Sequence, residues 1–274
     1  MIETQGTADR IIAAFARCRD GGNLALLAYL TVGYPSSAAT MEIAHALSEA
    51  GVDAVEFGIP FSDPLADGPT IQATSAAALR AGVTVEQCLS AAATFREADQ
   101  QTALLFMGYY NPILQYGAER FAAAAQACGA DGLIVPDLPL EEAEELDGPC
   151  RERGLGIVPL VAPNTSVDRI SRLAARGATF LYVTTRLGVT GARSNLPPEL
   201  PQLLSKVRRE TALPLAVGFG ISSPAQVASV RGLAEGAVVG SALLDRLAAA
   251  RDPVPEVASF ITPLVQAAHS GAIR

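Results

Sequence analysis

Apolar runs of about 5 to 10 residues recur along the whole chain, and each one is closed by Gly, Pro, Asp or Asn. Within a run nearly every position is apolar, instead of every second position. That pattern is typical of strands that are buried on both faces of a parallel sheet. We therefore predict eight parallel strands, which begin near Leu24, Asp53, Ala103, Asp131, Leu155, Thr179, Leu213 and Gly236.

Helical stretches lie between these strands, and four of them are followed directly by a glycine. Residues 40–50 precede Gly51, and residues 167–176 follow Ser166, which is a favourable N-cap. Further helices are expected at 84–96, 116–128, 140–153, 198–211, 224–233 and 242–250, with flanking helices at 8–19 and 254–269.

Eight strands that alternate with eight helices in about 250 residues match a (β/α)8 TIM barrel. The alternative is a doubly wound open sheet, which usually has fewer strands and often a GxGxxG turn after the first one. Here the first strand ends Thr-Val-Gly-Tyr-Pro, without that turn. No Ser- or Pro-rich linker occurs, so we expect residues 1–274 to form a single barrel domain with an extra N-terminal helix. The gap of about 45 residues between the second and third strands requires another helix or a long loop.

Composition and charge exclude several classes of protein. Half of the residues are hydrophobic and 18% are charged, which supports a large core and excludes wholesale disorder. The net charge is -8 without basic runs, so we expect no nucleic-acid binding. The longest apolar run, 24–32, is far shorter than the roughly 18 residues of a membrane span, so no membrane association is expected. Residues 1–10 contain no signal-peptide core.

The cysteine and histidine content indicates a reducing cytoplasm and no metal site. The cysteines are scattered without a CxxC pair, so neither a disulfide framework nor a zinc site is expected. They are Cys18, Cys88, Cys128 and Cys150. The two histidines, His45 and His269, have no partner at metal-ligand spacing. We expect the cysteines and His45 to be structural.

The second predicted strand supplies one candidate carboxylate and the loop after it supplies another, and in such barrels the working groups lie at the C-terminal ends of the strands. Glu56 stands inside the apolar run Ala-Val-Glu-Phe-Gly, where burial would raise its pKa and suit it to acid–base catalysis near neutral pH. The alternative is a structural carboxylate with its hydrogen bonds satisfied. Asp67 comes eleven residues later, in a loop that can fold back over the barrel mouth. It is alternatively a helix cap, since Gly68-Pro69 resembles a helix start.

Three other polar residues follow predicted strands. Asp63, which precedes Pro64, is either a turn former or an exposed contact to a partner. Asn111 precedes a proline and is predicted to be a turn residue. Asp137 either orients a neighbouring loop or simply forms a turn.

The sixth strand and the loop after it add a candidate hydroxyl and a candidate lid. Tyr182 either reaches the barrel mouth or belongs to the core. Residues 185–198 form a long polar loop with glycines, which is typical of a lid that closes over a site. Thr190 would then hydrogen-bond a site carboxylate on closure. The alternative is a mobile surface loop.

The seventh and eighth strands end in glycine-containing turns, where barrels commonly bind phosphate. Glycines let the backbone approach the anion, and unpaired amides at a helix start point at it. The predicted donors are Gly220, Gly240 and Ser241, with Gly191 from the lid. Neither short motif contains Lys or Arg, so amides and the helix dipole would hold the anion. Plain tight turns are the alternative.

The stretch 56–72, Glu-Phe-Gly-Ile-Pro-Phe-Ser-Asp-Pro-Leu-Ala-Asp-Gly-Pro-Thr-Ile-Gln, closely resembles the signature of the tryptophan synthase alpha chain family. The segments Tyr-Tyr-Asn-Pro-Ile, Val-Pro-Asp-Leu-Pro, Leu-Gly-Val-Thr-Gly-Ala-Arg and Gly-Phe-Gly-Ile-Ser-Ser recur in the same order. The resemblance covers nearly the whole chain. It departs at Phe57, where Leu is commoner, and at 184–187, an unusual lead into the lid.

That resemblance implies a (β/α)8 barrel with an extra N-terminal helix and a retro-aldol lyase. The reaction cleaves indole-3-glycerol phosphate to indole and glyceraldehyde 3-phosphate. The implied catalytic residues are Glu56, Asp67 and Tyr182, with Thr190 as the loop threonine. The implied phosphate-binding amides are those of Gly191, Gly220, Gly240 and Ser241, and the implied indole-pocket residues are Tyr29, Ile71, Met107 and Ile134.

The resemblance also implies a partner and the absence of a cofactor. The expected partner is a beta chain that binds pyridoxal phosphate and receives indole through a tunnel in an α2β2 complex. The loop with Asp63 and Pro64 corresponds to the surface that faces this beta chain. No metal or organic cofactor is expected in this chain itself.

Two other functions compete with this one. A sugar-phosphate isomerase of histidine biosynthesis would share the glycine turns, but it normally has an aspartate on the first strand, and residues 24–32 contain no acidic residue. A non-catalytic subunit that only activates a partner would require the carboxylates to be dispensable.

Overall fold

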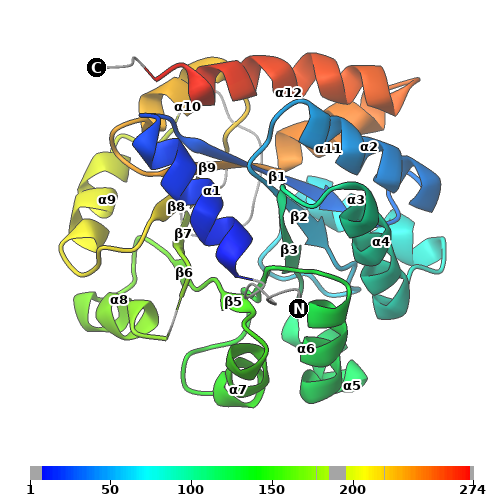
Figure 1. Ribbon diagram of the computed structural model, residues 1–274, viewed down its shortest axis with the longest axis horizontal. Coiled ribbons are helices and arrows are strands. Elements are labelled where there is room, and N and C mark those ends of the chain that lie inside the picture. Colours follow the sequence, from blue (N-terminus) through cyan, green and yellow to red (C-terminus); the bar gives the residue numbers. More distant parts are fainter. Residues whose placement is uncertain (1–7, 177, 185–195, 219, 272–274) are drawn as a thin grey trace, which may run out of the picture.

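The computed structural model describes residues 8–176, 178–184, 196–218 and 220–271 (Figure 1). This part of the chain forms the predicted parallel barrel, with strands in a ring and helices around them. The strands are β1 (Ala25–Thr31), β2 (Ala54–Gly58), β3 (Ala103–Met107), β4 (Gly132–Ile134), β5 (Gly156–Ile157), β6 (Leu160–Val161), β7 (Leu181–Thr184), β8 (Leu215–Gly218) and β9 (Gly236–Val239).

The barrel closes through the fifth predicted strand, which the structure divides into β5 and β6. The hydrogen-bonded order is β5-β4-β3-β2-β1-β9-β8-β7-β6, so its two ends are consecutive in the chain. On one side, Val158 donates its N–H to the carbonyl of Leu133 (3.0 Å). On the other side, the carbonyl of Pro159 accepts the N–H of Tyr182 (3.0 Å). Since proline has no N–H to donate, Pro159 interrupts the ladder without opening the ring.

Every residue of β1, β2, β3 and β4 is buried, as the nearly continuous apolar runs predict. One face of each strand points into the barrel interior and the other lies under the helices, so both faces exclude water.

Helices surround the ring (Figure 1). Those on the main circuit are α2 (Ser37–Glu49), α3 (Pro69–Arg80), α4 (Val85–Ala98), α5 (Tyr110–Tyr116), α6 (Ala118–Ala127), α7 (Glu144–Glu152), α8 (Val167–Ala174), α9 (Leu200–Arg208), α10 (Pro224–Val230) and α11 (Ser241–Ala249). The flanking helices are α1 (Asp9–Asp20) and α12 (Pro253–His269). None of the helices in the described ranges has the length and apolar character that crossing a membrane requires.

Several helix starts follow from local sequence. The Ser166 side chain accepts the N–H of Arg169 (3.3 Å), which confirms it as the N-cap of α8. Thr84 and Gln87 form a reciprocal capping box at the start of α4. Both α3 and α4 lie in the long gap between β2 and β3, where another helix or a long loop was expected.

The turn prediction for Asn111 is wrong, because Asn111 lies in the first turn of α5. Pro112 is tolerated there, since the first helical residues have no intrahelical acceptor for their N–H groups. Asp137 accepts the N–H of Tyr110 through Oδ1 (2.9 Å) at the start of the same helix. Of the two alternatives for Asp137, the structure therefore supports the one in which it orients a neighbouring segment.

The predicted N-terminal helix, α1, covers the end of the barrel where the strands begin. Its Phe15 ring packs against Phe180, just before β7 (5.0 Å between centroids). Its Arg10 pairs with Asp131, just before β4 (2.8 Å). This end of the ring is therefore closed by packing and charge, and the other end is left for a site.

Candidate active site

A cavity lies among the C-terminal ends of the strands, the end at which barrels of this kind carry their working groups. Its walls come from strands on both halves of the ring and from the segments that follow β2, β8 and β9. The lining residues are Tyr29, Glu56, Ile71, Met107, Tyr182, Gly220, Val238, Gly240 and Ser241.

Glu56 points into this cavity because its neighbour points the other way. The ring of Phe57 packs outward against Phe95 of α4 (5.7 Å between centroids). Successive side chains of a strand alternate between its two faces, so Glu56 faces the barrel interior. Glu56 is in register with Tyr29 of β1, which places both side chains on the same wall.

The carboxylate of Glu56 is fully buried (0% exposed), and neither of its oxygens has a hydrogen-bond partner within the described residues. Burial raises the pKa of Glu56 from its ordinary 4.5 to about 8. The predicted alternative of a structural carboxylate with satisfied hydrogen bonds therefore has no support in this part of the chain. A carboxyl group that is protonated near neutral pH can donate a proton and afterwards take one back.

Asp67 is also buried (4% exposed), but it has one partner. The hydroxyl of Tyr109 donates to Oδ2 of Asp67 (3.1 Å) and accepts the N–H of Ala66 (2.9 Å). Within the described residues Oδ1 has no partner. Burial raises the pKa of Asp67 to about 6, although the Tyr109 bond opposes that rise. Asp67 is therefore mostly ionised at neutral pH.

The alternative of Asp67 as a helix cap does not fit this geometry. The N-cap of α3 is Gly68, which has no capping side chain, and the Asp67 carboxylate is bonded to Tyr109 on the β3 side. Tyr109 is a partner of Asp67 that the sequence did not predict. The only signal was its place after the third strand, in the segment from which Asn111 alone was chosen.

Two buried tyrosines, Tyr29 and Tyr182, line the cavity together with Glu56. Burial raises the pKa of Tyr182, and the charges of Glu56 and Asp67 raise it further. The pKa of Tyr29 rises for the same reasons. Both hydroxyls therefore stay protonated at neutral pH.

A glycine makes room for each of these rings. A Cβ atom added at Gly58, at the end of β2, would overlap the ring and hydroxyl of Tyr29. A Cβ atom at Gly218, at the end of β8, would overlap Tyr182 in the same way. Real Cβ atoms do not approach so closely, so these two positions restrict where the tyrosines lie.

The far side of the cavity is built from backbone. Gly220 has a φ of +103°, a conformation that side chains other than glycine rarely adopt. Gly240 is the N-cap of α11, Ser241 is its first residue, and the strand β9 ends only one residue earlier. The first N–H groups of a helix have no intrahelical acceptor and carry the positive end of the helix dipole. This wall is therefore suited to an anion, although no Lys or Arg from the described part of the chain lines the cavity.

The remaining walls are apolar. Ile71 and Met107 line the cavity as expected, and Val238 of β9 does so without having been predicted. Ile134 is fully buried and in register with Met107, but it does not line the cavity. Apolar walls of this kind are suited to a flat apolar ring.

Two predicted site residues lie outside the described part of the chain. Thr190 and Gly191, with most of the lid predicted over 185–198, belong to the range 185–195. Their contacts with the cavity stay predictions.

Asp63 lies on the loop above the cavity and is exposed. Its carbonyl accepts the N–H of Leu65 (2.9 Å), and its carboxylate accepts the Ser62 hydroxyl. Both alternatives for Asp63, a turn former and a contact to a partner, remain compatible with this arrangement. The neighbouring side chain of Leu65 is 86% exposed.

A larger hollow lies outside the ring, next to α7 and α8, and it shows a different chemistry. Its arginines are already paired: Arg176 holds both oxygens of Asp147 (2.7 and 2.6 Å). Arg169 holds Glu141 in the same bidentate way (2.9 and 3.0 Å). Because its charges are satisfied, this hollow lacks the unpaired acid–base groups that distinguish the barrel mouth.

The chain was compared with known protein families and sequences. A family model described as tryptophan synthase alpha chain matches residues 15–269. The tryptophan synthase alpha chain of Chloroflexus aurantiacus is 48% identical over 260 residues, which cover 94% of this chain and 98% of that relative. The tryptophan synthase alpha chain of Roseiflexus castenholzii is 50% identical over 236 residues, covering 86% of this chain and 90% of the relative.

Solved structures give the same picture. A chain from Mycobacterium tuberculosis tryptophan synthase matches with a TM-score of 0.88 and 36% identity, covering 94% of this chain and 97% of that one. The tryptophan synthase alpha chain of Legionella pneumophila matches with a TM-score of 0.87 and 32% identity, covering 97% and 99%.

Proposed function

Because the chain belongs to the tryptophan synthase alpha chain family, whose members cleave indole-3-glycerol phosphate in tryptophan biosynthesis by an aldol-type lyase reaction, we propose that its barrel-mouth cavity holds and cleaves that substrate. One observation carries the proposal. The Glu56 carboxylate is fully buried without a partner in the described residues, and it lines the same cavity as the N-terminus of α11.

The reaction breaks the bond between indole C3 and the adjacent carbon of the glycerol phosphate chain. C3 must gain a proton, and the hydroxyl on the adjacent carbon must lose one as it becomes the aldehyde. The bonding electrons return to the indole ring and cancel the charge that protonation created. Since one proton is given and one is taken, a single carboxyl group that does both is restored at the end of the cycle.

Glu56 is suited to both transfers. With a pKa of about 8 it begins the cycle protonated and donates to C3. The carboxylate that forms then lies in an apolar, buried position, where it is a stronger base than in water. It takes the hydroxyl proton and returns to its starting state.

Asp67 is suited to a different role. Protonation of C3 leaves a positive charge at the indole nitrogen, and an ionised carboxylate near that nitrogen stabilises it. Oδ1 of Asp67 has no partner among the described residues and can accept the indole N–H, while Tyr109 donates to Oδ2. Tyr109 therefore positions Asp67 in this proposal without contacting the substrate.

Binding is divided between the apolar and backbone walls. Ile71, Met107 and Val238 enclose the indole ring, together with Tyr29. The amides of Gly220, Gly240 and Ser241 bind the phosphate. The Tyr182 hydroxyl donates to the reacting part of the substrate, and Ile134 supports the indole pocket from behind Met107. Thr190 and Gly191 complete the site from the lid, with Thr190 on a site carboxylate and Gly191 on the phosphate.

Acid–base catalysis alone does not account for an enzyme-like rate. It typically supplies 10² to 10⁴-fold, or about 3 to 5.5 kcal/mol. Anchoring of the phosphate at one wall and of the ring at another supplies the positioning that the remaining acceleration requires.

The family pairs with a beta chain, and its alpha chains do not themselves bind pyridoxal phosphate. We propose that this chain likewise forms an α2β2 complex with a beta chain in the cytoplasm. We propose also that it has no cofactor of its own. The exposed Leu65 next to Asp63 supports a partner on the loop above the cavity. The four buried free cysteines support a reducing compartment.

Indole release from indole-3-glycerol phosphate by the purified chain, with and without a beta chain, tests the proposal. Glu56→Gln and Asp67→Asn should each lower kcat by at least about 10²-fold, while substrate Kd changes little. Glu97→Gln, an exposed change on α4, is the matched control and should leave kcat unchanged.

Each competing function has its own outcome in this assay. Near-wild-type indole release by Glu56→Gln would remove Glu56 from the chemistry. If the wild-type chain releases no indole but still activates a beta chain, a regulatory subunit replaces the lyase. Turnover of a sugar phosphate in place of indole-3-glycerol phosphate would favour the isomerase.

A further inference from the structure

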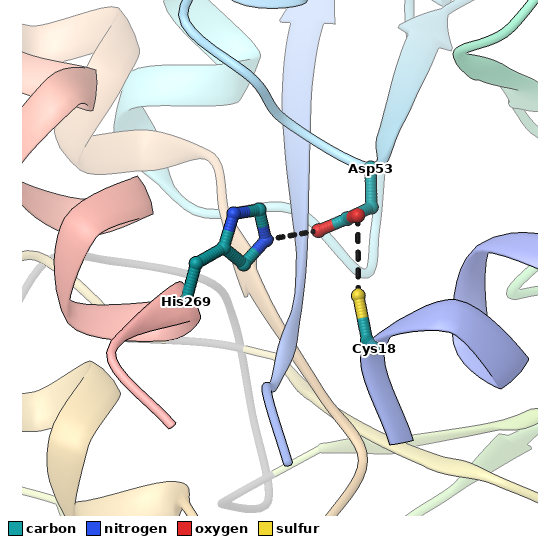
Figure 2. Close-up of side chains that lie close together, drawn as sticks. All are labelled: Cys18, Asp53 and His269. Atoms are coloured by element: carbon teal, nitrogen blue, oxygen red, sulfur yellow. Dashed lines mark hydrogen bonds and ion pairs between the residues drawn. The ribbon is translucent and has the colours of Figure 1, made fainter. Parts of the chain in front are cut away.

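Three side chains that the proposed reaction does not use meet near the end of the barrel opposite the cavity (Figure 2). Cys18 lies in the last turn of α1, Asp53 directly precedes β2, and His269 ends α12. They are 35 and 216 residues apart along the chain, so the spacing of the histidines and cysteines could not reveal the group. Only the fold brings them together.

Figure 2 shows Asp53 between the other two residues. Cys18 Sγ donates to Oδ1 of Asp53 (3.2 Å), and His269 Nε2 lies 2.9 Å from Oδ2. One ligand atom from each of the three lies within 4.8 Å of the others. Ligand atoms around a tetrahedral zinc ion are separated by roughly 3.3 to 3.8 Å, because the bonds are about 2.0 to 2.3 Å long. Small side-chain rotations therefore suffice to direct all three at one ion.

The backbone of residues 23–26 is hydrogen-bonded to the chain segments that carry all three side chains. Asn23 N–H donates to the carbonyl of Cys18 (2.7 Å), and Leu24 N–H donates to the carbonyl of Ala268, next to His269 (3.0 Å). Leu26 N–H donates to Oδ2 of Asp53 (2.9 Å). The three positions are thus fixed relative to one another before any ligand arrives, which lowers the cost of binding.

We propose that Cys18, Asp53 and His269 form a binding site for one divalent transition-metal ion of the zinc class, with a coordination position left for water. A thiolate and an imidazole are ligands that zinc, cobalt and iron accept and that magnesium and calcium do not prefer. The carboxylate supplies the third ligand. Three protein ligands and one open position are a common arrangement for zinc.

The protons balance in this scheme. Without an ion the Cys18 thiol is protonated, because burial, with help from the Asp53 charge, raises its pKa. In the ion-free chain Nε2 of His269 also carries a proton, because the Asp53 carboxylate can only accept a hydrogen bond. The ion displaces the thiol proton and the Nε2 proton, and both pass to solvent. The neutral ring that binds the ion through its Nε2 lone pair holds its proton on Nδ1, taken from solvent if the ring was not already charged. The Leu26 N–H still donates to the Asp53 carboxylate when the ion is bound. It therefore orients this ligand from the second coordination shell.

Solvent ions can reach the three side chains, and their negative charges can balance a divalent ion. The His269 side chain is 30% exposed and that of Asp53 is 11% exposed, so an ion reaches the site from the His269 side. Arg231 lies nearby, but its guanidinium is bonded to the carbonyl and hydroxyl oxygens of Ser270 (2.8 Å each). A thiolate and a carboxylate together offset one divalent ion. The bound ion would link α1, α12 and the start of β2.

Cobalt titration of the chelator-treated full chain tests the site, because thiolate-bound cobalt has a charge-transfer absorption band. One Co²⁺ per chain should produce this band, and one Zn²⁺ should displace it. Cys18→Ser should abolish the band, while Asp53→Asn and His269→Gln should weaken binding by at least about tenfold. Cys88→Ser and His45→Gln, which alter a buried cysteine and the other histidine elsewhere in the fold, are matched controls and should bind normally.

A second measurement guards against variants that do not fold. Zn²⁺ should raise the thermal midpoint of the wild-type chain and of His45→Gln but not that of His269→Gln, with circular dichroism as the check on folding. Absence of the band in the wild-type chain overturns the proposal, as does a band that persists in Cys18→Ser. Neither readout depends on lyase activity, so the outcome is independent of the proposed reaction.

Discussion

The two ends of the barrel treat a buried carboxylate in opposite ways. At the mouth, Glu56 is 0% exposed and has no partner within the described residues. At the closed end, Asp131 is equally buried, but Arg10 (2.8 Å) and Arg96 (3.1 Å) pair with it and the N–H of Leu104 donates to it (2.7 Å). Burial raises the pKa of Asp131 only to about 6, because these partners oppose the rise, while that of Glu56 reaches about 8.

The difference shows that burial of a charge does not by itself indicate function. Asp131 is bonded to α1, to α4 and to the backbone of β3, so it holds the fold together. Glu56 is bonded to nothing in the described chain, which leaves its proton free for a ligand. An unpaired buried carboxylate lowers the stability of the fold, so its presence indicates a role other than stability.

The largest effect on stability is expected from removing the charge at the closed end. Asp131→Asn leaves Arg10 and Arg96 without their counter-charge, so the free energy of unfolding should fall by about 3 to 5 kcal/mol. Glu56→Gln removes no partner and should leave stability unchanged or raise it. Urea unfolding of both variants measures the contrast, and equal losses in the two would contradict it.

The pH dependence of stability should isolate Glu56. Its pKa is raised in the folded chain, from 4.5 to about 8, so the folded state holds a proton that the unfolded state has lost. Stability from this group is therefore present below the unfolded pKa and is lost as the pH rises. Relative to Glu56→Gln, the wild-type chain should lose roughly 3 kcal/mol between about pH 5 and pH 8.

The same pKa values predict a bell-shaped profile of kcat/KM. Activity should rise through about pH 6 as Asp67 ionises and fall through about pH 8 as Glu56 loses its proton. A profile that rises through pH 8 would show that Glu56 must start as a base.

Two glycine substitutions, one at each end of the barrel, should lower stability by similar moderate amounts but differ in their effect on activity. Gly58→Ala forces Tyr29 to move at the mouth, and Gly236→Ala brings a Cβ to 2.9 Å from Phe15 at the closed end. Each should cost about 1 to 3 kcal/mol of stability. Only Gly58→Ala should also lower kcat/KM per folded molecule, and the smaller side chain of Tyr29→Leu in the same chain should relieve its stability loss. Steady-state kinetics beside thermal unfolding distinguishes the two.

The smallest effect is expected from Tyr109→Phe. It removes the hydroxyl that donates to Asp67, which is worth about 0.5 to 1.5 kcal/mol. Since that bond lowers the pKa of Asp67, the acid limb of kcat/KM should shift to higher pH by a few tenths of a unit to about one. An unchanged acid limb with lowered stability would reduce Tyr109 to a structural residue.

The sequence predicted what depends on local pattern. The barrel followed from runs that are apolar throughout, and Glu56 stood out because a charged residue interrupts one of them. The proline after Asn111 suggested a turn, although a helix accepts proline in its first turn, so α5 was missed.

Relations between distant residues were beyond the sequence. Tyr109 bonds Asp67 across 42 residues, and His269 meets Asp53 across 216. Val238 lines the cavity only because β9 lies beside β1 in the closed ring. No periodicity or short motif reports such pairings, since they exist only once the strands are in register.

The one-residue passage from β9 into α11 has a consequence for how such a chain can change. Peptide amides are common to every residue except proline, so most replacements at the α11 start would leave the proposed grip on phosphate in place. Single side-chain substitutions would therefore not reveal these phosphate-binding amides. A change of substrate would arise more readily from substitutions in the apolar walls of the cavity. Descendants of this protein would keep an affinity for phosphorylated molecules long after their chemistry had diverged.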